Sequence, residues 1–455
     1  MDDPGQLSGI ADLQRRSSQD PEKSLKTLQR MLLDRGEDIA SAIGRDLGRC
    51  WLESWSAEPG LALADTRYAL SRLRSWRRPC RLRLSPPMIP GRVRGIREPY
   101  GIAVIIGPWN YPAGLLLCPM VSALAAGNSV ILKPSERAPE TAAVLKDVIG
   151  EYFSPETAAV VSGGGEIARR LVSEVADIVC FTGSGPTGRK VMAGAAQRPV
   201  PVILELGGVN PCFVDSSAHL RNAARRIAWG KFFGAGQTCL APNHVFVQRS
   251  IHNEFLNELA AALKDFYGQD PFDSQDYGRI IDTAAWDALE PLLRLGRVFA
   301  GGETSREDLY IAPTILVDID ENSSVLKREI FGPILPVVPV DSIDKAAAAT
   351  GTGDRSPLTV YGFSSRGREM ERMLRNVTRS GSITVNGTLH RIVSSSIGFG
   401  GVGGSGFGRY RGKEGFRAFS WERVVLRKSG RFEMPRLYPP YRIGRKFIKM
   451  LSRFF

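Results

Sequence analysis

Histidine is scarce in this chain of 455 residues: only four occur, and none is spaced from another as a metal-binding pair. The six cysteines include no Cys-x-x-Cys pair, so the sequence indicates neither a zinc ribbon nor a disulfide framework. We therefore expect no metal, and a reducing, cytoplasmic compartment. The longest uncharged apolar stretch, residues 114–127, is interrupted by Pro119 and is too short to span a bilayer, which favours a buried helix.

The whole chain carries a formal net charge of +13, and acidic residues are missing from part of it. Nine arginines and no acid lie in residues 72–97. A basic balance can indicate a nucleic acid or an anionic lipid as partner, but no nucleic-acid-binding motif accompanies these arginines. We expect no nucleic acid partner, and interpret this stretch as a solvated surface or a subunit interface. The first twenty residues are polar and contain acids, so we do not expect a secretory signal peptide there.

The order of secondary-structure signals predicts an α/β protein. Apolar residues recur at helical spacing in residues 21–48, and a second helix is expected over 51–79, followed by an extended segment up to Pro99. From Tyr100 onward, short β-branched runs are each followed by a turn and a helix; the expected strands are 102–106, 129–132, 158–161 and 178–181. A second series runs from Pro211 to about Val385. Alternation of this kind predicts parallel sheets that bind ligands at the carboxyl ends of their strands.

Cys239 carries the strongest chemical signal in the chain. It ends the stretch FGAGQTC (233–239), whose small residues would let a substrate carbon approach the sulfur. A thiolate is the best side-chain nucleophile near neutral pH and adds directly to a carbonyl carbon. Glu205, at the end of an apolar run and before two glycines, suits a general base. A buried, unreactive cysteine is the common alternative, and these two segments alone leave both interpretations open.

A glycine-rich turn follows one predicted strand and opens a helix expected over 187–196, a context typical of a pyrophosphate cradle. Its residues are Gly183, Ser184, Gly185, Pro186, Thr187 and Gly188. Applied mechanically, this motif would make Glu205 the acid that holds the ribose hydroxyls, which competes with the general-base role. A second match at 401–406 lacks a strand–helix context, and we interpret it as a loop where backbones pack closely.

Other polar residues also follow predicted strands. Lys133 and Glu136 would bracket the hydroxyls of a ribose; the alternative is a helix start with Ser135 as N-cap. The Asn110 amide would donate to a developing oxyanion, together with the backbone N–H of Cys239.

Glu329 and Phe331 lie near a turn, where the carboxylate would hold a second ribose and the ring would brace a flat group. Taken by itself, this segment favours a purely structural interpretation.

Six ordered segments of the chain together resemble the aldehyde dehydrogenase superfamily, over about residues 20–430. They are PWN (108–110), KPSE (133–136), FTGS (181–184), ELGG (205–208), GQTC (236–239) and EIFGP (329–333). DLGR at 46–49, RYAL at 67–70 and YPPY at 438–441 look like the class 3 branch, which acts on fatty and aromatic aldehydes. Departures from the family pattern are Gly185 for the usual Thr, Val209-Asn210 for the common Lys-Ser, and Ile397 for the usual Pro.

The resemblance implies a role for each candidate residue. It makes Cys239 the nucleophile, Asn110 the oxyanion donor and Glu205 the base that activates the hydrolytic water, which settles the competition over Glu205. The expected cofactor contacts are the 183–188 turn for the phosphates, Lys133 and Glu136 for the adenosine ribose, Glu329 and Phe331 on the nicotinamide side, and Trp109 and Leu206.

The implied activity is oxidation of aldehydes to carboxylic acids with NAD or NADP. The Cys239 thiolate would form a thiohemiacetal and, after hydride loss, a thioester that water hydrolyses. Medium- or long-chain aliphatic, or aromatic, aldehydes are the expected substrates, in an apolar tunnel lined by Trp109, Tyr111, Leu115 and Phe233. The alternative is a non-catalytic structural or nucleotide-binding protein that retained the fold.

The resemblance also implies a division of the chain. A Rossmann-like NAD(P)-binding domain is expected over 1–80 and 100–208, and an α/β catalytic domain over 209–395. A small β bridging element, formed by 81–99 and 396–430, would join two subunits of a homodimer. A basic tail follows at 431–455.

The tail carries a separate hypothesis. Its apolar residues share one helical stripe (Ile443, Phe447, Leu451, Phe454), and its cations largely occupy the other face. Such a helix over 442–455 would bind an anionic surface on the cytoplasmic face of a membrane. The alternatives are an arm packed on the partner subunit and a disordered end.

Overall fold

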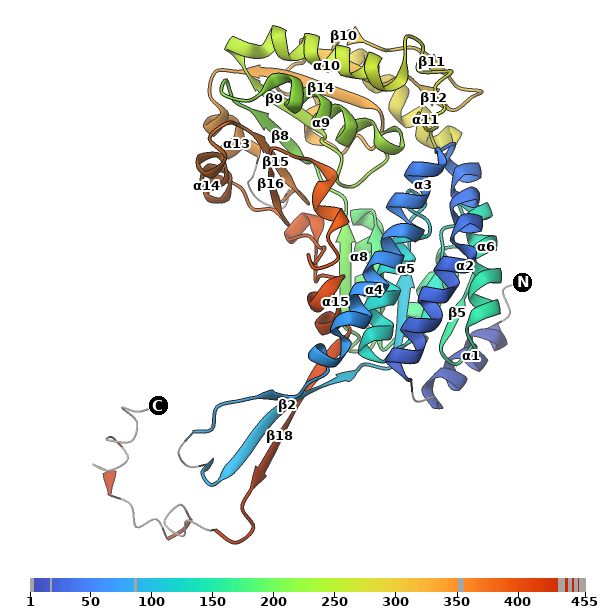
Figure 1. Ribbon diagram of the computed structural model, residues 1–455, viewed down its shortest axis with the longest axis vertical. Helices are drawn as coiled ribbons and strands as arrows, with labels where there is room; N and C mark the ends of the chain where they lie inside the picture. Colours follow the sequence, from blue (N-terminus) through green and yellow to red (C-terminus); the bar gives the residue numbers. More distant parts are fainter. Residues whose placement is uncertain are drawn as a thin grey trace.

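Two α/β units and a long β arm make up the protein (Figure 1). The computed structural model describes residues 4–16, 19–85, 88–350 and 356–432, together with 438–440, 444, 445 and 449. Each unit is built on a mostly parallel sheet, which confirms the α/β prediction. The residue boundaries of the expected domains stay predictions.

The first unit contains a six-stranded sheet in the order β17-β7-β6-β3-β4-β5. Only β17 is antiparallel to its neighbour among these strands. The strand order reverses at β3, so the ligand crevice of this sheet lies at the carboxyl ends of β3 and β6. The strands are β3 (Ile102–Ile106), β4 (Ser129–Lys133), β5 (Ala158–Val160), β6 (Ile178–Gly183), β7 (Val202–Leu206) and β17 (Gly406–Phe407).

Both faces of this sheet are covered, because alternate residues of β3 belong to different cores. Ala103 and Ile105 lie in one apolar cluster with α2, α4 and α5, whereas Val104 and Ile106 lie in another with α8. Burial on both faces explains the unbroken apolar runs of these strands. The helices are α1 (Pro4–Arg16), α2 (Pro21–Leu47), α3 (Trp51–Ala57), α4 (Pro59–Trp76), α5 (Gly114–Ala126), α6 (Pro139–Tyr152), α7 (Gly165–Arg170) and α8 (Gly185–Ala195).

The prediction of a single helix over 51–79 is wrong, because the chain breaks between α3 and α4 at Glu58. Pro59 has no N–H and disfavours the helical conformation of the residue before it. Glu58 accordingly has φ −128° and ψ −88°, and Pro59 occupies the first turn of α4. The break leaves the Glu58 side chain fully buried.

The second unit is a seven-stranded sheet in the order β10-β13-β14-β9-β8-β15-β16, in which only β10 is antiparallel to its neighbour. Its strands are β8 (Pro211–Val214), β9 (His244–Gln248), β10 (Arg297–Ala300), β13 (Thr314–Val317), β14 (Ile334–Val340), β15 (Val360–Phe363) and β16 (Ile383–Val385). Its helices are α9 (Leu220–Phe232), α10 (His252–Tyr267), α11 (Thr283–Leu289), α12 (Ser324–Lys327), α13 (Ile343–Thr350) and α14 (Gly367–Val377). A short hairpin, β11 (Thr304–Ser305) and β12 (Tyr310–Ile311), lies beside α11 (Figure 1).

The arm pairs β2 (Gly91–Pro99) with β18 (Ser420–Lys428) along their whole lengths, and β1 (Cys80–Arg81) joins the other edge of β2. It projects away from both units, and α15 (Gly412–Ala418) leads into it (Figure 1). The extended segment expected up to Pro99 is therefore confirmed.

The amphipathic helix expected over 442–455 lies outside the described residues, apart from the isolated positions 444, 445 and 449, and stays a prediction. Within the described ranges, none of the helices has the length and apolar character that crossing a membrane requires.

Candidate active site

Cys239 lies in a tight coil between α9 and β9. Gly234, Ala235 and Gly236 all have positive φ (59°, 52° and 74°), the left-handed region in which a chain turns sharply and which glycine adopts readily. Gln237 fixes the coil, since its side-chain amide donates to the carbonyls of Gly234 (3.2 Å) and Arg279 (2.9 Å). Its amide oxygen accepts the N–H of Ile281 at 3.0 Å. The small residues of FGAGQTC therefore shape the turn itself.

Asn210 holds the other side of the coil. Its amide group donates to the carbonyl oxygens of Cys239 (2.6 Å) and Ala241 (3.1 Å) and accepts the N–H of Thr359 (3.0 Å). The Asn side chain that departs from the family pattern thus anchors the Cys239 peptide, a contact that the sequence alone did not indicate.

The structure brings Asn110 to the Cys239 coil, as the sequence predicted. Asn110 lies in the segment after β3, is 3% exposed, and donates its side-chain N–H to the carbonyl of Gln237 at 2.9 Å. The hydroxyl of the next residue, Tyr111, bonds Thr238 Oγ1 at 2.7 Å. Two bonds therefore join the strand end to the residues directly before Cys239.

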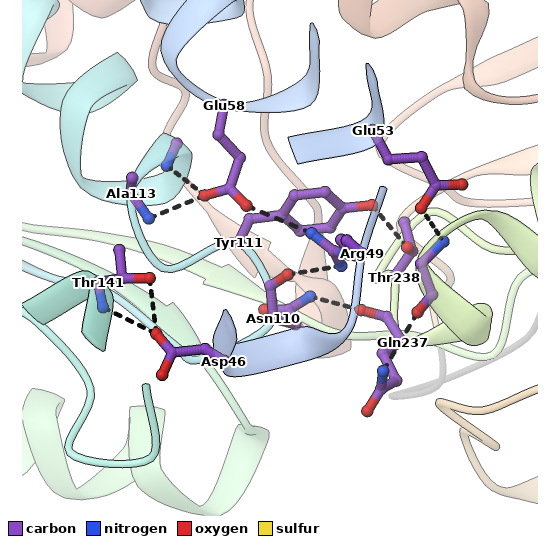
Figure 2. A network of polar contacts seen from close by, with 12 residues as sticks. Asp46, Arg49, Glu53, Glu58, Asn110, Tyr111, Ala113, Thr141, Gln237 and Thr238 are labelled. Carbon is purple, nitrogen blue, oxygen red and sulfur yellow. Dashed lines mark hydrogen bonds and ion pairs between the residues drawn. The ribbon is translucent and has the colours of Figure 1, made fainter. Parts of the chain in front are cut away.

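An arginine that sequence reasoning missed lies behind this junction (Figure 2). The Arg49 side chain is fully buried, donates to the Asn110 carbonyl at 2.8 Å, and lies 4.5 Å from the centre of the Tyr111 ring. It also pairs with Glu58 at 3.3 Å. The only signal was the DLGR motif, which had served solely as a mark of resemblance.

Glu205 lies on β7, the strand paired directly with β6, and is 1% exposed. No described side chain donates a hydrogen bond to either carboxylate oxygen, although the Gly401 N–H faces the carboxylate closely enough to favour its charged form. Burial raises the pKa of Glu205 well above its ordinary value, and the cations Arg391 and Arg409 oppose that rise. The 401–406 loop packs on β7, where Gly406 pairs with Glu205 and a side chain at Gly406 would collide with the Leu204 carbonyl. The close-packing interpretation of that loop is confirmed.

The half-buried Cys239 lies within the electrostatic influence of Glu205. Burial raises the pKa of its thiol above the ordinary range, the carboxylates Glu205 and Glu329 raise it further, and Arg391 lowers it. The thiol must therefore lose its proton before the sulfur can attack. The negative charge of the nearby Glu205 opposes that loss, because it raises the pKa of the thiol.

Cys239 opens onto an apolar cavity of about 240 Å³. Tyr111, Leu115 and Phe233 line this cavity as expected, but Trp109 does not. The Trp109 ring instead meets Phe331 edge-on at 5.4 Å, on the side of the expected nicotinamide contacts. The remaining wall includes Leu61, Trp229, Leu240, Leu389, Ile392, Val393 and Phe399.

The glycine-rich turn joins β6 to α8, so its context is the expected one. Ser184 caps the helix by accepting the N–H of Thr187, and a side chain at Gly188 would collide with Leu206, so this glycine lets α8 pack closely on β7. The buried hydroxyl of Thr182, directly before the turn, has no partner among the described residues. The positive end of the α8 dipole beside an unpartnered hydroxyl fits a dinucleotide phosphate.

Lys133 and Glu136 form an ion pair of 2.9 Å at the end of β4, with the lysine buried and the carboxylate 61% exposed. An exposed carboxylate at a strand end suits a ribose. The alternative role of Ser135 as a helix N-cap is wrong, because α6 begins at Pro139 after Ala138.

Glu329 and Phe331 also reach the site. The Glu329 carboxylate packs on Gly207 and accepts the N–H of Gly208 at 3.2 Å. Burial raises the pKa of Glu329 to about 7. Burial also lowers the pKa of the nearby Lys231 to about 7, a residue that the sequence reasoning had not singled out. Phe331 has a φ of +55°, a strained conformation that is common at functional sites.

Comparisons with known proteins agree with this geometry. A sequence profile described as "Aldehyde dehydrogenase family" matches residues 10–425. The chain is 42% identical to a 4,4'-diapolycopene-4,4'-dial dehydrogenase of Cytobacillus firmus, over 88% of each chain. It is 40% identical to the dimeric, NADP-preferring aldehyde dehydrogenase of Rattus norvegicus, over 90% of this chain and 89% of the relative. The solved structure of substrate-bound Staphylococcus aureus AldH superposes with a TM-score of 0.94, at 34% identity and full coverage of both chains. The chain belongs to the aldehyde dehydrogenase family.

Proposed function

We propose that this enzyme oxidises medium- or long-chain aliphatic aldehydes, or aromatic aldehydes, to carboxylic acids through a covalent intermediate on Cys239. As a member of its family it uses NAD or NADP. The observation that carries the substrate class is the cavity at Cys239, whose wall is formed mostly by aliphatic and aromatic side chains, with Ser56, Thr238 and Arg411 as its polar members. Such a cavity favours an apolar chain and disfavours a charged one.

In the proposed reaction, Cys239 gives up its proton to solvent water, and the thiolate sulfur then bonds to the aldehyde carbon. The carbonyl oxygen becomes an oxyanion, which the Asn110 amide and the Cys239 N–H stabilise. Asn110 is already held at the coil by its bond to Gln237. A bound nicotinamide supplies an acceptor for the hydride that the substrate carbon loses. Cys239 then carries the acyl group as a thioester.

Glu205 completes the cycle by taking a proton from water, which attacks the thioester carbon; the C–S bond breaks, and the acid leaves. The Glu205 carboxylate has no side-chain hydrogen-bond partner among the described residues, which leaves it able to accept a proton. The 183–188 turn, Lys133 and Glu136 would hold the phosphates and the adenosine ribose, and Glu329 and Phe331 would flank the nicotinamide, beside Trp109 and Leu206.

The substrate class is tested with a graded series of straight-chain aldehydes. We expect kcat/KM to rise by up to about fourfold per added CH2 until the cavity is filled, because burying one CH2 contributes about 0.8 kcal/mol. Absorbance of the reduced nicotinamide measures the rates. In Leu115→Asn the preference for long chains should weaken, with kcat/KM for short aldehydes changing much less. Turnover confined to short, polar aldehydes would refute the proposed class.

We also propose a homodimer joined through the arm. Val424 and Leu426 lie on one face of β18 and are 58% and 43% exposed, apolar surface that a second subunit would cover. One relative is described by its name as dimeric. Light scattering should give twice the chain mass for the wild type, and V424E/L426E should shift the protein towards a monomer. A monomeric wild type would contradict the proposal.

A further inference from the structure

The segment between α2 and α3, α3 itself and the break at Glu58 place a charged cluster directly behind the candidate active site. Arg49, Glu53 and Glu58 come from the segment between α2 and α3, from α3 and from the α3–α4 break. They lie around the junction between the Asn110–Tyr111 segment and the Cys239 coil (Figure 2). We propose that Arg49 is a positioning residue that locks this segment onto the Cys239 coil, and thereby sets the geometry of the oxyanion site. The inference rests on the proposed reaction.

Arg49 holds the strand-end side of the junction by two contacts. One guanidinium N–H donates to the Asn110 carbonyl at 2.8 Å, which fixes the peptide from which the Asn110 side chain projects. The guanidinium also lies over the Tyr111 ring at 4.5 Å, while the Tyr111 hydroxyl bonds Thr238 at 2.7 Å. Both residues that touch the coil are therefore oriented by one cation.

The same guanidinium packs against the coil itself. A Cβ on Gly234 would lie 2.6 Å from Arg49 Nη2 and 2.9 Å from Nε, so only glycine lets the two approach. Glu53, on α3, accepts the Gly234 N–H at 3.0 Å. Arg49 thus occupies the space between the two halves of the oxyanion site.

Glu58 holds Arg49 in place. Its carboxylate pairs with Arg49 at 3.3 Å and accepts the N–H groups of Ala113 (2.8 Å) and Gly114 (2.9 Å), at the start of α5. Glu58 therefore connects the cation to the helix that follows the Asn110 segment, so a shift of Arg49 would be felt at both ends of that segment.

A stabilising role alone does not explain this arrangement. Arg49 Nε is buried without a hydrogen-bond partner among the described residues, and a buried unpaired donor is costly. The other buried arginine pair of the first unit, Arg411 with Asp65, uses both Nε and Nη2 on the carboxylate and donates Nη1 to the Ile392 carbonyl. Arg49 leaves a donor unused and instead contacts the residues that flank Cys239.

The test compares Arg49→Met/Glu58→Gln with Glu58→Gln, so that neither protein leaves the Glu58 carboxylate buried without its cation. We expect the added Arg49 change to lower kcat about 10- to 100-fold, while the Kd for NAD and the KM for a long-chain aldehyde change less than about threefold. The deuterium isotope effect on kcat, with aldehyde labelled at C1, should rise because the hydride step becomes more rate-limiting. A merely structural residue would not move the isotope effect.

Arg49→Lys provides a second variant should the first fail to fold. It keeps the charge, but an ammonium lacks the planar fork that reaches Asn110 and Glu58 together while lying over the Tyr111 ring, so kcat should fall several-fold. Arg30→Met is the matched control, since Arg30 also lies over a tyrosine ring (Tyr152, 5.7 Å) but at an exposed site. Unchanged kcat and isotope effect in folded Arg49 variants would overturn the inference. A wild type without aldehyde-dependent turnover would overturn the proposed function instead.

Discussion

Replacing Cys239 by alanine should abolish aldehyde-dependent reduction of NAD or NADP, with kcat falling by at least about 10³-fold. The reaction as proposed has no path without the sulfur, because the substrate carbon cannot give up its hydride until the tetrahedral adduct has formed. Stopped-flow and steady-state absorbance of the reduced cofactor measure the loss, and fluorescence titration with NAD checks that cofactor binding persists.

Cys212→Ala is the matched control. Cys212 is also a free thiol whose pKa is raised by burial, but it is fully buried and lies in β8, outside the cavity wall. Its variant should keep kcat within about twofold of the wild type. Turnover by C239A comparable to that of C212A would place the nucleophile elsewhere.

Glu205→Gln should separate the two halves of the reaction. Acylation of Cys239 proceeds, but water is no longer deprotonated, so steady-state kcat should fall about 10²- to 10⁴-fold. Mixing the variant with NAD and a long-chain aldehyde should still give a rapid burst of about one reduced cofactor per active site. The amide keeps the shape of the side chain, so the cavity and coil are expected to remain intact. A variant that loses the burst together with turnover would show that Glu205 acts before hydride transfer.

The pH dependence of thioester hydrolysis tests the role of Glu205 independently. Burial raises the pKa of Glu205, and only its deprotonated form accepts a proton from water. Thioester hydrolysis in the wild type should therefore fall as the pH drops through this raised pKa, and recover above it. The Glu205→Gln variant should lack this limb.

Local patterns in the sequence were sufficient to predict which strand ends and turns surround the candidate site. Strand ends, the glycine-rich turn and the motifs at Asn110, Lys133 and Cys239 are short patterns, and β3, β4, β5 and β6 begin where strands were expected. Parallel strands bring their carboxyl ends to one edge, so residues far apart in sequence could be placed together before the structure was known.

Contacts between distant segments could not be predicted in the same way. Arg49, Glu58 and Gly234 meet only because the chain breaks before Pro59 and the coil turns through left-handed residues, and no periodicity marks such a cluster. The direction of the Trp109 ring was also beyond the sequence, since it depends on whether Phe331 or the cavity offers the better packing.

The departure at position 210 has a physical explanation in the structure. An amide can donate to two carbonyls and accept one N–H at the same time, and Asn210 does so between the Cys239 coil and Thr359. A hydroxyl has one donor only, so the Ser usual in the family could not make the same set of bonds. Asn210 therefore ties the Cys239 coil to the segment directly before β15.

The most direct test of the account is the mass of the intermediate. Glu205→Gln mixed with NAD and a long-chain aldehyde, quenched in acid during the burst, should show one added acyl group, the mass of the aldehyde less two hydrogens, and peptide mapping should place it on Cys239. Reduced cofactor without any adduct, or an adduct on another residue, would contradict the covalent mechanism centred on Cys239.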